Sequence, residues 1–136
     1  MVPSAAPAAP VSPEAAYDAL TGALDISRRL RRPLTVLMVE IVDPENAPRL
    51  GDLRRFLSET LRDSDGVWPL RHDRIIVLLS DADALGRVSP VERIRARLGP
   101  DTSRSLVLGQ ITVPPGADPD DVLSLVEDAR MPLASG

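Results

Sequence analysis

Hydrophobic residues follow two spacings along the chain, one typical of helices and one typical of buried strands. Apolar residues recur at helical spacing through Tyr17–Leu30, and this helix is expected to end before Pro33, which cannot continue it. Leu34–Val42 is an almost continuous run of β-branched and aliphatic residues, as in a strand buried on both faces. Leucines with a period near 3.6 predict a second helix over residues 50–61. The first half of the chain therefore predicts a helix, a strand and a helix.

The second half continues this alternation. Two short apolar segments, Val67–Leu70 and Ile75–Leu79, flank a polar tetrapeptide and predict a β-hairpin. Val91–Leu98 is expected to form a helix and Ser105–Val113 a strand. Asp120–Met131 predicts a last amphipathic helix, and its acidic first turn complements the helix dipole. Together these elements predict an α/β domain in which helices cover a central sheet that contains a hairpin.

Composition indicates where the folded part begins and ends. The 136 residues suit one domain. Residues 1–13 contain four prolines and four alanines and no charged side chain. Such a segment buries too little apolar surface to offset the entropy lost on ordering. We therefore expect a disordered leader over residues 1–15 and a single domain over residues 16–134.

Charge and residue usage exclude several functions. Acidic residues outnumber basic ones by 20 to 16, and the net charge of −4 argues against a DNA or RNA partner. With no cysteine and one histidine, the chain is not expected to form disulfides, thiolate sites or His-rich metal sites. Every basic residue is arginine, which excludes lysine-dependent catalysis. No apolar run approaches the roughly 20 residues that span a bilayer, so we expect a cytoplasmic protein without membrane insertion.

Five segments of the chain share an order with a known enzyme family. Asp18–Gly22 reads D-x-L-T-G, and Leu34–Glu40 is a buried strand that ends in an acid. Leu70–Leu79 is a hairpin followed by an aliphatic strand, Val91–Arg95 opens the next helix, and a strand and a closing helix follow. In this order and at nearly this spacing, they resemble the GGDEF (diguanylate cyclase) family. The resemblance implies a nucleotidyl-cyclase-like fold with a mostly antiparallel or mixed sheet of about five strands, flanked by helices.

The resemblance also implies a lost active site. The family joins two GTP molecules into cyclic di-GMP with Mg²⁺ held by two carboxylates. Its Gly-Gly-Asp/Glu-Glu-Phe signature reads Arg71-His72-Asp73-Arg74-Ile75 here. Arg71 and His72 replace glycines that let the backbone approach the nucleotide. Arg74 replaces the second metal carboxylate, and Glu40 matches the first. Ala134 stands where the family has a phosphate-contacting lysine. We therefore expect no cofactor, no magnesium site and no cyclase activity.

The reversed charge suggests a new pairing. Glu40 and Arg74 are expected at adjacent strand ends, where the guanidinium would replace the metal as partner of the carboxylate. An arginine–carboxylate pair is strong and directional, whereas a glutamate buried alone would be costly. The sequence therefore predicts an ion pair between these two residues.

A second nucleotide site of the family has a counterpart in this chain. The family's non-catalytic site has the core R-x-x-D, ending five residues before the signature hairpin. Here Arg62-Asp-Ser-Asp65 has that spacing, and Arg93 matches a further arginine on the following helix. Arginines can bind phosphate and guanine, so the resemblance implies that Arg62, Asp65 and Arg93 bind cyclic di-GMP. The alternative is an i,i+3 surface pair of Arg62 with Asp65 and a solvated arginine face around Arg93.

Other residues fit structural roles better than chemical ones. His72 is expected to be an exposed hairpin residue because no nucleophile motif accompanies it. The acids at Asp81, Asp83 and Asp118–Asp121 fit turns and helix caps, since neither group follows the EF-hand pattern. Trp68 could be a core residue or an interface anchor. The basic segment Arg28–Arg32 could serve a neighbouring subunit or simply end a helix.

These observations lead to three hypotheses for function. In the first, the chain is an inactive GGDEF-like receptor or adaptor in which cyclic di-GMP regulates binding to a protein partner or to a second copy. In the second, the fold is a nucleotide-independent scaffold for protein interaction. Residual cyclase activity through Glu40 is the third reading, and the sign reversal at Arg74 argues against it, because like charges about 4 Å apart repel by about 4 kcal/mol at an effective dielectric of 20.

Overall fold

The computed structural model describes residues 11–62, 64–80 and 89–133. Its first helix, α1 (Pro13–Leu30), begins at a proline in the first turn and is capped by Ser12, whose Oγ accepts from the amide of Ala15 at 3.1 Å. It ends at Arg31, which has left-handed backbone angles (φ 53°). The helix starts four residues before the predicted Tyr17, so residues 13–15 belong to α1 rather than to a leader. The leader prediction otherwise concerns residues 1–10, which lie outside the described part.

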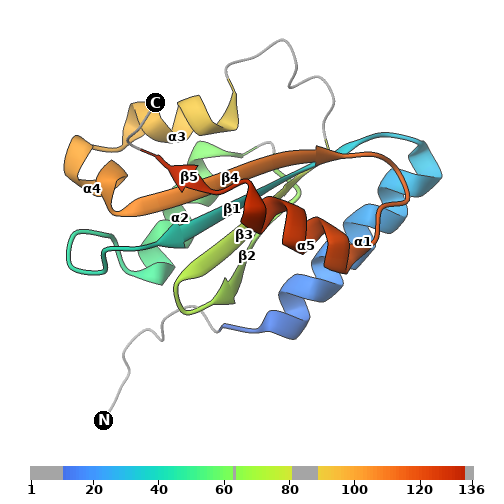
Figure 1. Ribbon diagram of the computed structural model, residues 1–136, viewed down its shortest axis with the longest axis horizontal. Helices are drawn as coiled ribbons and strands as arrows, with labels where there is room; N and C mark the ends of the chain where they lie inside the picture. Colours follow the sequence, from blue (N-terminus) through green and yellow to red (C-terminus); the bar gives the residue numbers. More distant parts are fainter. Residues whose placement is uncertain (1–10, 63, 81–88, 134–136) are drawn as a thin grey trace.

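The centre of the molecule is an antiparallel five-stranded sheet with the order β2-β3-β1-β4-β5 (Figure 1). The central strand β1 pairs with β3 through a register that places Glu40 opposite Arg74. It pairs with β4 on its other side, where Glu40 lies opposite Val107. The predicted fold class is therefore confirmed. The strands are β1 (Leu34–Ile41), β2 (Gly66–Arg71), β3 (Arg74–Leu79), β4 (Leu106–Val113) and β5 (Met131–Pro132).

Helices cover both faces of this sheet, which explains the continuous apolar run of β1. Leu37 and Val39 pack in a core with α2 (Leu50–Thr60) and α3 (Pro90–Arg97). Val36 and Met38 point to the other face and pack in a second core with α1 and α5 (Pro119–Asp128). Because successive strand residues alternate between faces, a strand between two helical layers must be apolar at nearly every position.

Three local features depart from the sequence expectation. A one-turn helix, α4 (Pro100–Arg104), precedes β4 and was not expected. The last helix ends at Asp128 instead of continuing to Met131, and Met131–Pro132 pair with β4 as the short strand β5. Proline cannot donate a helical hydrogen bond, which fits a helix end shortly before Pro132. No helix in the described ranges is long and apolar enough to span a bilayer.

Helix α5 lies very close to the sheet at Gly109 of β4. A Cβ atom at this position would lie 2.4 Å from the carbonyl oxygen of Val126, which real side chains essentially never do. Glycine therefore allows the end of α5 to approach the sheet, and this approach places the residues after α5 beside the end of β1. Asp118 caps the helix by accepting from the amides of Asp120 and Asp121, as the sequence predicts.

Candidate functional site

A nearly buried ion pair lies at the end of the sheet where strand β1 stops and the β2–β3 hairpin turns. The guanidinium of Arg74 (Nη2) lies 3.3 Å from Oε2 of Glu40, and the two side chains are 15% and 12% exposed. Their opposite positions in the β1–β3 register explain this contact, because directly paired residues project from the same face. The predicted Glu40–Arg74 ion pair is therefore present.

Glu127, in the last turn of α5, and Arg130, two residues after the end of this helix, complete the cluster. Nη1 of Arg130 contacts Oε1, the second carboxylate oxygen of Glu40. Nη1 of Arg74 also lies 3.5 Å from Oε2 of Glu127, and Nε of Arg130 donates to the carbonyl oxygen of Glu127 at 2.9 Å. Glu40, Arg74, Glu127 and Arg130, which we call the ion cluster, therefore hold two carboxylates and two guanidiniums. Both oxygens of Glu40 already have cationic partners.

The magnesium of the GGDEF family does not fit these residues. A hard divalent cation needs several oxygen ligands, and the carboxylate best placed to provide one, Glu40, is contacted by guanidinium groups on both oxygens. Arg74 also puts a positive charge where the second carboxylate would be needed. Across the described part of the chain, no group of three or more His, Asp or Glu residues is arranged to hold a metal ion. We therefore assign no metal chemistry to the ion cluster.

The hairpin turn beside the ion cluster carries the other altered signature residues. Arg71 and His72 are exposed, which confirms the expectation for the histidine. The carbonyl oxygen of Asp73 accepts from the amide of Ile41 at 2.8 Å and ties the turn to the end of β1. The register shifts between Pro69 and Arg71, as at a β-bulge. Two bulky exposed side chains thus occupy the positions where the family signature has glycines.

The three residues of the predicted cyclic di-GMP site lie on different elements. Arg62 is exposed, directly after the cap of α2, and Arg93 is half-buried on α3. Asp65 precedes β2, and its Oδ2 accepts from the amide of Ser80 at 2.9 Å. Within the ranges 11–62, 64–80 and 89–133, no hydrogen bond or ion pair joins Arg62 to Asp65, so the simple surface pair is not formed. The three residues thus come from the end of α2, the segment before β2 and the helix α3.

Asp65 faces the α1 side of the molecule. Together with Trp68, Leu78 and Ser80 it lines a groove whose other wall is α1. Helix α3, which carries Arg93, packs with α2 on the opposite layer. Trp68 is half-buried, packs against the core beneath α1 and lies over Gly66, where a Cβ would come within 2.5 Å of its Nε1. The open question about Trp68 is thus resolved in part: its ring packs on the core and also lines an accessible groove.

Sequence reasoning missed Arg130 and Glu127. Both lie within the amphipathic helix expected over Asp120–Met131, where an acid and an arginine look like ordinary solvated positions. Their role depends on a contact between residues 90 positions apart, which helical periodicity cannot reveal. The one available signal is Pro132, which ends a helix and leaves Arg130 close to that end, where its side chain can turn back to the sheet. The position Ala134 and the acids Asp81 and Asp83 lie outside the described residues.

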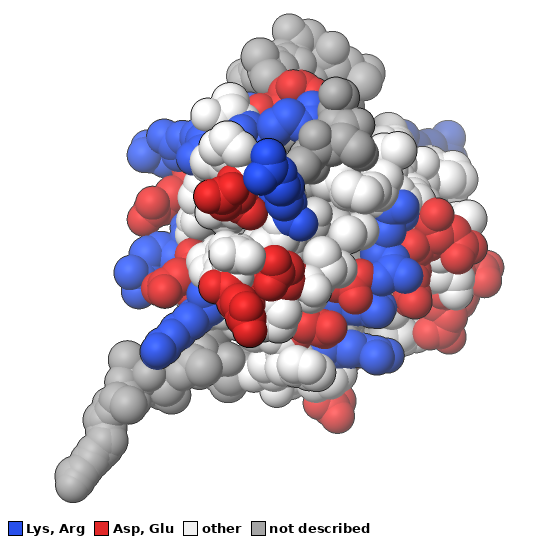
Figure 2. Space-filling view, turned by 60° about the vertical axis from the view of Figure 1, so that its left-hand side comes forward, with Lys and Arg blue, Asp and Glu red and all other residues white. Residues whose placement is uncertain are grey.

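Charges elsewhere on the surface are mixed. Figure 2 shows acidic and basic side chains interspersed over the face that includes the hairpin end of the sheet, without a continuous basic field. On α1, Asp25 bonds with Arg28 and Arg29 at 2.7 and 2.6 Å. Partial burial raises the pKa of Tyr17, and the carboxylates of Asp120 and Asp118 raise it further, with Asp120 also as its hydrogen-bond partner. These contacts join α1 to the start of α5.

The family model described as GGDEF-like domain matches residues 10–130, so the chain belongs to this family. Solved structures agree on the fold. The GGDEF domain of FimX from Pseudomonas aeruginosa superposes with a TM-score of 0.67 at 13% identity, covering 94% of this chain and 91% of that domain. The diguanylate cyclase SiaD from the same organism, solved in complex with its activator SiaC, superposes with a TM-score of 0.61 at 16% identity.

The match to SiaD includes most of this chain but only about half of the SiaD chain. It covers 85% of this chain but 52% of the SiaD chain, so this chain spans about half the length of that protein. At such low identities both likenesses show the fold alone. No curated protein matches the chain.

Proposed function

We propose that this chain is a catalytically inactive GGDEF-like domain that acts in the cytoplasm by binding rather than by turnover. One observation carries this proposal: both carboxylate oxygens of Glu40 are contacted by guanidiniums, at the edge where the family holds its metal. Without a metal-bound triphosphate there is no electrostatic stabilisation for phosphoryl transfer.

The ligand we propose is cyclic di-GMP, bound through Arg62, Asp65 and Arg93. Arg62 and Asp65 are exposed, and the spacing of the R-x-x-D sequence from the hairpin matches the family's non-catalytic site. Guanidiniums bind phosphate and guanine edges, and a carboxylate accepts from guanine N1–H and its amino group. The backbone amide of Ser80 donates to Oδ2 of Asp65, and this hydrogen bond fixes the position of the carboxylate near the solvent. The bound state would change the affinity for a protein partner.

Calorimetric titration of the chain with cyclic di-GMP tests this proposal. We expect binding in the micromolar range, and its loss in Arg62→Ala and Asp65→Ala. Arg55→Ala removes another exposed arginine, on α2, and serves as the matched control that keeps the affinity. Binding that is equally strong in Arg62→Ala would contradict the assigned site. Incubation with GTP and Mg²⁺, followed by chromatography for cyclic di-GMP, tests the absence of cyclase activity.

A nucleotide-independent scaffold is the second candidate function. It is favoured by the position of Asp65, whose carboxylate faces the groove at α1 while Arg93 belongs to the α3 layer. The complex of SiaD with SiaC supports the general idea that a protein with this fold can be bound by a protein activator. If no heat of binding is observed up to millimolar cyclic di-GMP, the scaffold becomes the better description.

A further inference from the structure

An accessible apolar groove runs beside α1, apart from the ion cluster. One wall is the flank of α1 formed by Ala19, Gly22, Ala23 and Ile26, and the other comes from the edge of the sheet. The groove holds about 360 Å³, and its floor includes the ring of Trp68 and the side chain of Leu78. It is thus mostly apolar, with the carboxylate of Asp65 at its rim.

The same flank of α1 exposes large apolar side chains next to the groove. Ile26 is 52% exposed and Leu30, one turn further on, is 57% exposed. Large residues thus lie in the C-terminal half of this flank, whereas its N-terminal half has the small residues Ala15 and Ala19. A contiguous apolar surface beside a groove is a feature of interaction sites rather than of ordinary solvated helices.

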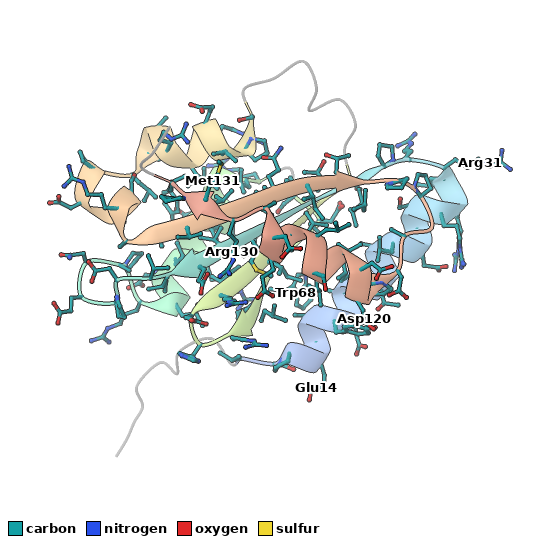
Figure 3. The ribbon with its side chains drawn as sticks, viewed as in Figure 1. Glu14, Arg31, Trp68, Asp120, Arg130 and Met131 are labelled. Carbon is teal, nitrogen blue, oxygen red and sulfur yellow. The ribbon has the colours of Figure 1, made fainter. Side chains whose placement is uncertain are left out.

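Charge is distributed unequally along α1 as well. The N-terminal half carries Glu14 and Asp18, and the end of the helix carries the basic segment Arg28–Arg32, with Asp25 between them. Figure 3 shows Glu14 and Arg31 at opposite ends of the helix. A second α1 in antiparallel orientation would therefore set acidic against basic halves at both ends.

We propose that the α1 groove binds α1 of a second copy of this chain, antiparallel, around a two-fold axis near Gly22 and Ala23. A two-fold interface requires a self-complementary surface. The two halves of α1 meet this requirement, because one half has small and acidic side chains and the other has large and basic ones. With the axis between these two residues, Ile26 of one copy lies opposite Ala19 of the other, and Leu30 lies opposite Ala15. Each large side chain thus meets a small one, and each Ile26 faces the partner's groove.

This inference goes beyond the proposed function and does not rest on it, although Asp65, which the proposed function assigns to cyclic di-GMP, lies at the rim of the same groove. It also gives the basic segment Arg28–Arg32 a role in a subunit contact. Arg28 and Arg29 already bond to Asp25 within the chain, so their position is fixed before a second copy binds.

Sedimentation equilibrium of the full chain over a range of concentrations tests the proposal. We expect a concentration-dependent rise from 14.6 kDa to twice this mass. Ile26→Arg should weaken the association by about tenfold or more, because it places an unpaired charge against Ala19 of the other copy. Leu125→Arg alters an equally exposed apolar residue on α5 and should leave the association unchanged.

Charge reversal tests the antiparallel arrangement itself. A variant with Glu14→Arg and Asp18→Arg and a variant with Arg29→Glu and Arg32→Glu should each associate more weakly alone, because like charges then meet at both ends. A mixture of the two should form a heterodimer, because opposite charges meet again at both ends. Circular dichroism of each variant establishes that it is folded.

Three results would overturn the proposal: a monomer at every concentration up to about 1 mM, equal loss of association in Ile26→Arg and Leu125→Arg, or a mixture of charge-reversed variants that stays monomeric. Calorimetry with cyclic di-GMP on Ile26→Arg, in which a second copy no longer competes for the groove that contains Asp65, makes failure of the dimer and failure of the ligand hypothesis distinguishable.

Discussion

Two charged regions at opposite ends of the β2–β3 hairpin differ sharply in this chain. At the end with the hairpin turn, Glu40 and Arg74 are nearly buried and joined to Arg130. At the other, Arg62 and Asp65 are exposed, and the carboxylate is held by a backbone amide. The first region pairs its charged side chains with one another, whereas the second keeps charged groups in contact with solvent.

The largest effect is expected from breaking the ion cluster. Glu40→Ala leaves Arg74 and Arg130 close together without their shared carboxylate, and we expect a loss of about 2–4 kcal/mol in the free energy of unfolding. Urea denaturation measures this loss. Glu127→Ala removes a half-exposed carboxylate from the same cluster and should cost less than about 1 kcal/mol. Equal costs for the two variants would show that burial of Glu40 does not distinguish them.

A smaller effect is expected when α5 is pushed away from the sheet. Gly109→Ala places a Cβ against the carbonyl oxygen of Val126, and we expect a loss of about 1–3 kcal/mol because helix backbone must move. Thermal and urea denaturation measure it. Gly22→Ala is the matched control: no atom lies within 4 Å of its Cβ, so stability should rise by about 0.5–1 kcal/mol from helix propensity. Unchanged stability in Gly109→Ala would contradict the close approach.

In the exposed region of Arg62 and Asp65, removal of a charge should have a modest effect on stability. Asp65→Ala loses the bond to the amide of Ser80, and we expect a cost of about 0.5–1.5 kcal/mol in urea denaturation. Asp65→Asn keeps an acceptor and should recover part of this loss. A loss in the free energy of unfolding as large for Asp65→Ala as for Glu40→Ala would contradict the difference between the Arg62–Asp65 region and the ion cluster.

The smallest expected effect concerns Tyr17, the only tyrosine in the chain. Its pKa is raised above 10.0, so the folded state binds the phenolic proton more tightly than the unfolded state does. The resulting stabilisation is fully present below pH 10 and is lost as the pH rises through the folded pKa. Ultraviolet titration of the native chain measures this pKa, which should fall in Asp120→Asn. A Tyr17 pKa at or below 10 would contradict the contact between α1 and α5.

The sequence was sufficient for most of the fold because its signals are local. The apolar run of β1 predicts a strand between two layers, and Pro33 sets the end of α1 to within a few residues. The pairing of Glu40 with Arg74 was also predictable, since the family's order of strands places them side by side. Arg130 was not predictable, because its contact depends on the close packing of α5 at Gly109. The strand β5 was missed for a related reason: two residues are too few for a periodic pattern.

Glu40 joins three segments that are distant in the sequence: the central strand, the hairpin and the residue that follows α5. A segment that follows the last helix of a domain often frays before the rest of the domain, because few contacts hold it. Here fraying after α5 would break an ion pair with a residue 90 positions away. Opening of the C-terminal segment is therefore coupled to the middle of the sheet, and its amide hydrogens should exchange more slowly than those of an untethered chain end.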